Sequence, residues 1–202
     1  SLFYALRARD PATASHSLRV ALCCSSWALQ VQFKEDVQSA LEISALLHDV
    51  GKIGVPEAVL CKPGRLTEEE MSRIRQHPQI GYKILKDIPQ LRELLPAVLC
   101  HHEAWDGGGY PAGLSGEEIP LIARIVSVAD SFDAMSSSRT YRSALSREQV
   151  FAELERCAGT QFDPALVPTF LGLDLRSYDR HLIDDARPEK NGGSLDLGLE
   201  AA

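Results

Sequence analysis

Histidine and aspartate side chains occur in this chain at positions where they could bind a metal ion. His48 and Asp49 follow residues 41–47, which are apolar on nearly every side and predict a helix packed inside the domain. A buried imidazole and carboxylate need a partner, because an unmet hydrogen bond costs roughly 1–3 kcal/mol and an unpaired charge costs more. Neutral imidazole and carboxylate are usual ligands of zinc, iron and manganese. A structural ion pair or a helix-end hydrogen bond is the competing interpretation of this dipeptide alone.

Similar residues recur near the predicted ends of other helices. Five of the six histidines lie there, and two aspartates lie on apolar helices. The set is His16, His48, His77, His101 and His102 with Asp49 and Asp130. Singly, each histidine could be a first-turn residue, a partner of a helix dipole or a surface residue. Together they are too many polar groups for an ordinary core, whereas they suffice for two four-ligand metal sites that share a bridging aspartate.

Helical periodicity predicts the elements that carry these residues. We expect helices over residues 2–9, 16–31, 36–48, 67–77, 78–86, 91–102, 121–130, 146–157 and 164–173. Thr13 or Ser15 is expected to cap the second helix. Thr67 and Glu70 form a capping-box pattern, and His77 is expected to close the helix that they begin. The sequence has no strand-like alternation of useful length and no internal repeat, so the fold class is expected to be all-α.

The domain organisation follows from length and composition. Residues 1–174 are expected to form one domain, because 202 residues with 45% hydrophobic content can build a full core. The glycine-rich loop at residues 103–120 has the length of a functional loop. Residues 175–202 are expected to be a C-terminal tail, partly disordered, because the composition there shifts to polar residues and glycine. The start at Ser1, inside a helical segment, suggests a longer protein with further domains upstream.

Charge and cysteine content argue against several classes of protein. The net charge of −7 argues against binding of a nucleic-acid polymer, although a local basic patch could hold a small anionic substrate. No apolar run is long enough for a membrane span, and the first residues do not resemble a signal peptide. The five cysteines include no CxxC pair and favour a reducing, cytoplasmic location. Cys100, beside His101, is expected to pack rather than to bind metal.

An ordered string of motifs runs through the chain. It includes Arg9-Asp10-Pro11, His48-Asp49-Val50-Gly51-Lys52, Lys62-Pro63-Gly64, His77-Pro78, His101-His102-Glu103, Gly109-Tyr110-Pro111, Val128-Ala129-Asp130 and Gly159-Thr160-Gln161-Phe162-Asp163-Pro164. With this order and spacing, the sequence resembles the HD-GYP domain family, a branch of the HD metal-dependent phosphohydrolases, from about residue 7 to residue 171. The resemblance implies an HD-type helical bundle with a Gly-rich GYP loop. It also implies hydrolysis of the bacterial second messenger cyclic di-GMP to linear pGpG, and leaves further hydrolysis to GMP open.

The resemblance also implies roles for individual residues. One metal ion would be held by His16, His48, Asp49 and Asp130, and the other by Asp49, His77, His101 and His102. The two divalent ions are expected to be iron or manganese, although such ligands also accept zinc or nickel. Lys52 would hold a phosphate oxygen, Tyr110 would line the substrate pocket, and Arg139 and Arg142 would bind the outlying phosphate or guanine.

The expected mechanism is in-line attack on phosphorus by a hydroxide shared between the two ions, with Asp49 setting their spacing and Lys52 offsetting the charge on the phosphate. Glu103 could orient a histidine or a water, or form a structural salt bridge. Two departures from the family pattern matter. Ala12 replaces the Glu that members with three metals carry, which favours a dinuclear site, and Asp10 is out of phase to substitute for it. Thr140 stands where the family often has Pro, which puts substrate affinity in doubt.

Two other functions remain open from the sequence. The domain could be a cyclic-dinucleotide sensor, or a module that interacts with proteins such as diguanylate cyclase (GGDEF) domains. It could also hydrolyse another nucleotide, such as cyclic GMP-AMP. An upstream sensor or receiver domain and a homodimer formed through the first helix are further expectations.

Overall fold

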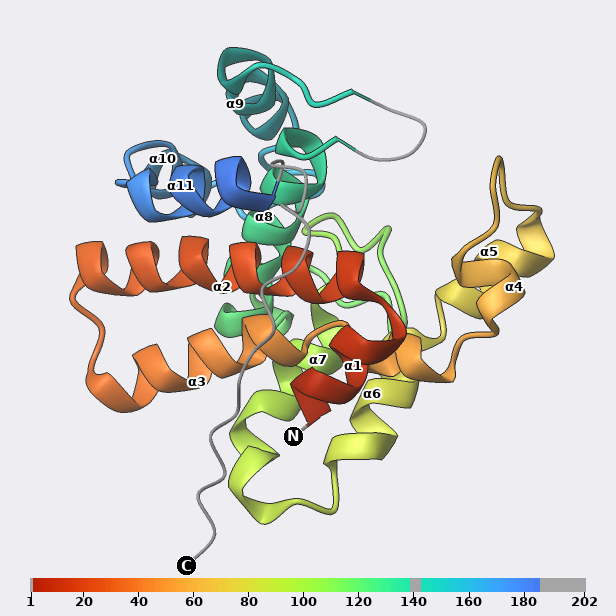
Figure 1. The fold of residues 1–202 in the computed structure, drawn as a ribbon. Helices are drawn as coiled ribbons and strands as arrows, with labels where there is room; N and C mark the ends of the chain where they lie inside the picture. Colours follow the sequence, from red (N-terminus) through yellow and green to blue (C-terminus); the bar gives the residue numbers. More distant parts are fainter. Residues whose placement is uncertain (1, 139–142, 186–202) are drawn as a thin grey trace, which may run out of the picture.

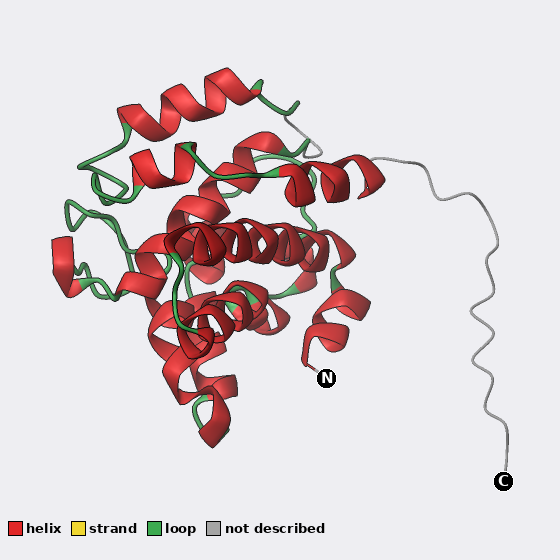
Figure 2. Ribbon diagram, turned by 90° about the vertical axis from the view of Figure 1, so that its left-hand side faces the viewer, coloured by secondary structure: helices red, strands yellow, loops and turns green. Residues whose placement is uncertain are grey.

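The computed structural model describes residues 2–138 and 143–185, and within these ranges it contains helices and loops but no β-strand (Figure 2). Ala158 and Phe162 form an isolated β-bridge. The helices, in chain order, are α1 Leu2–Arg9, α2 Pro11–Val31, α3 Glu35–Leu47, η1 Val50–Gly54, α4 Glu57–Leu60, α5 Glu68–Ile74, α6 His77–Leu85, η2 Pro89–Leu94, α7 Leu95–Cys100, η3 Gly116–Glu118, α8 Leu121–Ser136, α9 Arg147–Arg156, α10 Val167–Leu171 and α11 Arg176–Asp185. The expected all-α fold is confirmed.

The centre of the domain is the pair α2 and α3, with α8 crossing behind α2 (Figure 1). The main core lies between these helices and the C-terminal elements α9 to α11. Its largest buried side chains include Trp27, Phe132, Phe170 and Tyr178. Because α2, α3 and α8 pack on one another in the middle of the molecule, polar residues on their facing surfaces are brought together in a buried site.

The helix α2 begins five residues earlier than predicted. Asp10 is its N-cap, because Asp10 Oδ1 accepts a hydrogen bond from Thr13 N (3.1 Å), and Pro11 occupies the first turn. Thr13 Oγ1 donates to the other carboxylate oxygen. The expectation that Thr13 or Ser15 caps this helix is therefore wrong. His16 lies well inside the helix rather than in its first turn, and Asp10 is engaged in capping.

The boundary at His77 also differs from the prediction. The capping box of Thr67 and Glu70 is present at the start of α5, but α5 ends at Ile74 and His77 is the first residue of α6. The turn η1 packs against this start of α6. A Cβ atom on Gly51 would lie only 1.9 Å from the His77 carbonyl oxygen. Only glycine permits this approach, which brings Asp49, two residues earlier in the chain, beside His77.

The packed domain extends beyond residue 174. Residues 176–185 form α11, which packs along α2, and Tyr178 on α11 is fully buried. The polar composition of this segment suggested a tail. A short amphipathic helix needs only a few apolar residues to pack, so its composition can resemble that of a tail. Residues 186–202 lie outside the described ranges.

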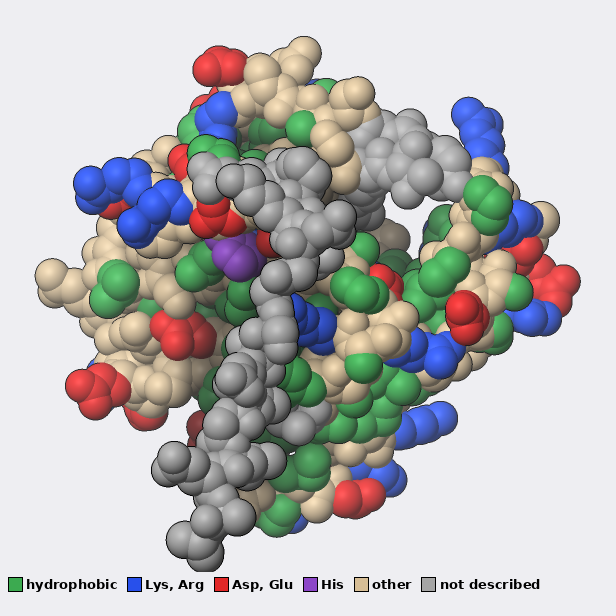
Figure 3. Space-filling view, in the orientation of Figure 1, with side chains coloured by type: hydrophobic (Ala, Val, Ile, Leu, Met, Phe, Trp, Pro, Cys, Tyr) green, Lys and Arg blue, Asp and Glu red, His purple; other side chains and the backbone are tan. Residues whose placement is uncertain are grey.

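The surface is mixed in charge. On the face drawn in Figure 3, described Lys and Arg side chains lie among Asp and Glu side chains. Among the described helices, none is long and apolar enough to cross a membrane.

Candidate metal centre

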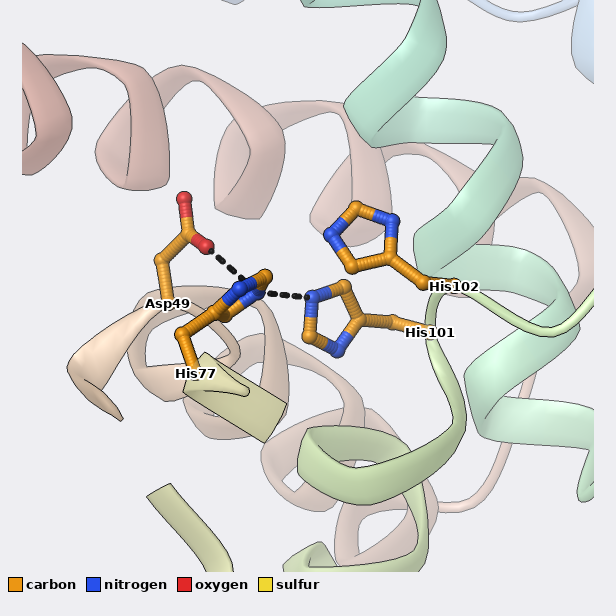
Figure 4. A group of neighbouring side chains, drawn as sticks. All are labelled: Asp49, His77, His101 and His102. Atoms are coloured by element: carbon orange, nitrogen blue, oxygen red, sulfur yellow. Dashed lines mark hydrogen bonds and ion pairs between the residues drawn. The ribbon is translucent and has the colours of Figure 1, made fainter. Parts of the chain in front are cut away.

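The helices bring seven ligand-type side chains together around the middle of the bundle. His16 comes from α2, His48 and Asp49 follow α3, His77 begins α6, His101 and His102 follow α7, and Asp130 comes from α8. Their donor atoms form two groups, each with atoms within 4.8 Å of one another. One group is Asp49, His77, His101 and His102, and the other is His16, His48 and Asp130. Figure 4 shows the first group, in which Asp49 and the three imidazoles point toward a common centre.

Asp49 lies between the two groups. Its Oδ1 atom is 3.2 Å from His77 Nε2 in the first group. Its Oδ2 atom is 3.4 Å from His48 Nε2 and 3.9 Å from His16 Nε2 in the second group. The two oxygens of one buried carboxylate therefore face different groups, which is the arrangement that a bridging ligand requires.

Three histidines have their tautomer fixed by backbone carbonyl groups. The Nδ1 atoms of His48, His77 and His101 lie 2.7, 2.8 and 3.0 Å from carbonyl oxygens, in each case of the residue three positions earlier in the chain. A carbonyl oxygen can only accept, so Nδ1 must carry the hydrogen in each ring. The Nε2 atom of each neutral ring then presents a lone pair.

Two of these lone pairs, on His77 and His101, face each other, and no donor in the described part of the chain reaches the third, on His48. His77 Nε2 and His101 Nε2 are 3.2 Å apart. Among the described residues, His48 Nε2 is buried and has no hydrogen-bond partner. Burial lowers the pKa of His77 to about 4 and holds the pKa of His101 well below its ordinary value, so a shared proton is not retained at neutral pH. A cation accepts all of these lone pairs, and neutral imidazole with carboxylate is the donor set of a transition-metal site. The residues present fit metal ions.

The negative charge of the Asp49 carboxylate also suits the binding of a metal ion. Burial alone would raise the pKa of this carboxyl, but the adjacent Lys52 ammonium is the strongest opposing influence and the pKa is held well below its ordinary value. Lys52 Nζ donates to Asp49 Oδ2 at 2.6 Å, and 22% of the Lys52 side chain is exposed. Lys52 is therefore at the site, but it is paired with Asp49 in this structure.

His16 differs from the other histidines because it faces two carboxylates. Its Nε2 atom lies 3.0 Å from Asp130 Oδ1, and its Nδ1 atom lies 2.6 Å from Asp133 Oδ2. Burial lowers the pKa of His16, but these two carboxylates outweigh burial and raise it to about 9. Asp133 thus takes the part that backbone carbonyls take at the rings of His48, His77 and His101. Asp133 had no predicted role, although a second carboxylate three residues after Asp130 on an apolar helix was a usable signal.

The Gly-rich loop closes one side of the site. The Tyr110 ring stacks on His102, with ring centroids 4.9 Å apart and 25° between the planes. The Arg75 guanidinium lies 5.8 Å from the centre of the Tyr110 ring, a neighbour that sequence reasoning missed. Arg139 and Arg142, expected to bind substrate, and Thr140 lie outside the described residues.

Glu103 organises this loop. Its carboxylate accepts hydrogen bonds from the backbone N–H groups of Ala112, Gly113 and Leu114 at 2.7, 3.0 and 3.1 Å. The expected roles, orienting a histidine or water or forming a salt bridge, are not the ones seen. Asp106 accepts a hydrogen bond from Gly108 N at 2.9 Å and so shapes the same loop.

Comparison with curated proteins finds phosphodiesterases. The chain is 40% identical over 188 residues to a cyclic di-GMP phosphodiesterase of Thermotoga maritima, covering 92% of this chain and 51% of the relative. It is 42% identical over 169 residues to the cyclic di-GMP phosphodiesterase response regulator RpfG of Xanthomonas campestris, covering 83% and 45%. It is also 37% identical over 175 residues to the 3'3'-cGAMP-specific phosphodiesterase 2 of Vibrio cholerae, covering 85% and 33%. The chain thus spans about half or less of the length of these relatives.

Solved structures share the fold. An HDG"Y"P protein from Bdellovibrio bacteriovorus superposes with a TM-score of 0.63 at 19% identity, over 77% of this chain and 50% of that one. The HD domain of the L. monocytogenes phosphodiesterase PgpH in complex with cyclic-di-AMP gives a TM-score of 0.60 at 20% identity, over 91% and 94%. A family model described as HD domain matches residues 3–166. The motif string, the helical fold and this match show that the chain belongs to the HD domain family.

Proposed function

We propose that this chain is the catalytic domain of a metal-dependent phosphodiesterase that hydrolyses cyclic di-GMP to pGpG. The observation that carries the proposal is the position of Asp49, whose two carboxylate oxygens face different groups of ligand-type side chains. The names of the curated relatives support the choice of substrate.

Two divalent ions would be held by the two groups, with Asp49 shared between them. His77, His101 and His102 would complete one ion's ligands, and His16, His48 and Asp130 the other's. Such ions supply Lewis acidity toward a phosphate oxygen and a water that ionises near neutral pH. Iron or manganese is our expectation, and zinc or nickel would also suit these ligands.

The chain's own residues bind and orient the substrate around this centre. The partly exposed Lys52 ammonium can contact a phosphate oxygen while Asp49 stays in place, and it would offset charge that builds on the phosphate. Tyr110, packed on His102 and beside Arg75, offers an aromatic surface at the edge of the site for a guanine base. Arg139 and Arg142 remain predicted contacts for the outlying phosphate or base.

A second candidate substrate is 3'3'-cyclic GMP-AMP, because relatives of similar identity carry that specificity in their names. The two cyclic dinucleotides share the same phosphodiester ring and differ in one base. The same metal centre could therefore act on either, and the residues that contact the base would decide between them. A sensor without catalysis is disfavoured by the complete set of ligand-type side chains.

The test is metal content and turnover measured on the same anaerobically purified sample. We expect close to two ions per chain by elemental analysis and formation of pGpG from cyclic di-GMP, faster than hydrolysis of 3'3'-cyclic GMP-AMP or cyclic di-AMP. Faster turnover of cyclic GMP-AMP would transfer the proposal to that substrate. Two ions without turnover of any of the three would indicate a sensor, and no tightly bound ion would refute the metal centre.

Other features of this function remain predictions. These are further hydrolysis to GMP, binding of diguanylate cyclase domains, an upstream sensor or receiver domain, a homodimer and a cytoplasmic location.

A further inference from the structure

We propose that the C-terminal helix α11 positions the metal-ligating side chain of His16, through the hydroxyl of Tyr178. The proposal rests on the function proposed above, in which His16 is a ligand. The family model ends at residue 166, so α11, Arg176–Asp185, lies beyond the part that defines the family. The helix nevertheless reaches the side chains that support the metal centre.

The link between α11 and His16 is the carboxylate of Asp133, which is fully buried. Its Oδ2 atom lies 2.6 Å from His16 Nδ1 and accepts from Arg19 Nη2 at 3.0 Å. Its Oδ1 atom accepts from Arg19 Nε at 2.6 Å and from the Tyr178 hydroxyl at 2.9 Å. All four contacts use atoms from α2 and α11, so the carboxylate that orients the imidazole is itself held by these two helices.

A second contact joins the same elements. The remaining terminal nitrogen of Arg19, Nη1, donates to Asp185 near the end of α11. Arg19 is thereby held between Asp133 and Asp185, one on each side. The two ends of α11 thus contact the same network, Tyr178 directly through Asp133 and Asp185 through Arg19.

The position of the Tyr178 hydroxyl is fixed by the packing of its ring. The ring lies 5.0 Å from that of Phe132, which immediately precedes Asp133, and the Tyr178 side chain is fully buried. A ring with so little freedom aims its hydroxyl at one place. Removing the hydroxyl would leave Asp133 Oδ1 with a single donor and allow the carboxylate, and with it the imidazole, to turn.

Outer partners of metal ligands typically contribute 10- to 100-fold to metal affinity. The hydroxyl acts one hydrogen bond further out than Asp133, so its removal should change metal affinity by the lower end of this range. We expect Tyr178→Phe to lower the affinity for one of the two ions about tenfold. The affected ion is the one bound by the group of His16, His48 and Asp130. The ion bound by Asp49, His77, His101 and His102 should keep its affinity, because none of these side chains contacts Asp133.

The experiment is calorimetric titration of the metal-stripped chain with Mn²⁺, for the wild type, Tyr178→Phe and a matched control. The control is Asp179→Asn, which removes the ion pair between Asp179 and Arg147 and so weakens the docking of α11 without touching Asp133. We expect the control to lower the unfolding temperature and to bind both ions as the wild type does. Asp185→Asn, at a partly exposed site, carries the test if Tyr178→Phe does not fold, with an expected loss of two- to threefold for the same ion.

Three outcomes would overturn the inference. They are unchanged binding of both ions by Tyr178→Phe, equal weakening of both ions, and a control that weakens the same ion as much as Tyr178→Phe does. The last would mean that docking of the helix matters and the hydroxyl does not. A wild-type chain that binds no Mn²⁺, nor any other divalent ion, would instead refute the proposed metal centre itself, and the inference with it.

Discussion

Replacement of Gly51 by Ala should damage both the fold and the metal centre. The new Cβ atom would lie 1.9 Å from the His77 carbonyl oxygen and 2.5 Å from Gly81 N. Ordinary van der Waals contact begins at 3.4 Å, so η1 and the start of α6 must separate by about 1.5 Å. Both obstacles are backbone atoms, which no rotamer change can move. We therefore expect a loss of about 2–3 kcal/mol, at the upper end of typical overpacking.

The same displacement should separate Asp49 from His77. These side chains are 3.2 Å apart at Oδ1 and Nε2, and each is within two residues of the obstructed contact. Metal ligands must keep their distances within about 0.2 Å, so the ion between them should bind far more weakly. Urea unfolding and metal analysis on one preparation measure the two effects, and the loss of stability corresponds to a fall in unfolding temperature of roughly 4–12 °C.

Gly54→Ala is the matched control, since Gly54 lies in the same short helix. The three atoms nearest to its Cβ atom would all belong to the Ile80 side chain, the closest at 2.8 Å, and that side chain can move. We expect a smaller loss of stability and normal metal content for this variant. A Gly51→Ala protein as stable and as metal-loaded as the Gly54→Ala protein would refute the idea that this backbone contact assembles the centre.

Three further predictions concern the site. Asp49→Asn should keep the fold but lose most bound metal and at least about 10³-fold in turnover, because an amide does not supply the negative charge of a bridging ligand. Circular dichroism, elemental analysis and a hydrolysis assay measure these three properties. Retained turnover would contradict the prediction. Glu103→Gln should weaken three loop hydrogen bonds and raise KM for cyclic di-GMP severalfold at unchanged metal content. Steady-state kinetics measure this effect. An unchanged KM would mean that the loop does not contact substrate. Removal of metal by a chelator should lower the unfolding temperature reversibly, because a bound ion raises the free energy of unfolding by about 2.7 kcal/mol at a free ion concentration 100 times Kd. A chelator without effect would indicate that no ion is bound.

The ligand-type residues that gather at the candidate metal centre could be predicted, but several helix boundaries around them could not. Clustered histidines and aspartates on apolar segments are expensive to bury, so their number alone indicated a common partner. His77 was assigned to the wrong helix, because Pro78 is compatible both with the end of one helix and with the first turn of the next. Asp10 was not recognised as a cap, because the apolar periodicity of α2 becomes clear only after its first turn.

Residues that support the site were harder to predict than the ligand-type residues. Glu103 lies beside a histidine pair, yet its carboxylate binds backbone N–H groups of a loop nine to eleven residues later, which depends on how that loop folds back. Tyr178 lies in a polar segment with little sign of packing, and its contact with Asp133 joins residues 45 positions apart. Such contacts are decided by tertiary packing, and local sequence carries little information about them.

The backbone contacts of His48, His77 and His101 make insertions and deletions more harmful than substitutions near this centre. Each ring donates to a carbonyl near the end of a helix, where the last carbonyls have no partner within the helix. One residue added between such a carbonyl and its histidine would rotate the ring away by about 100°. Changes in length should therefore be confined to places such as the segment around α4 and α5, which projects from the bundle in Figure 1. Spacing, as much as residue type, is the property that this centre requires of its sequence.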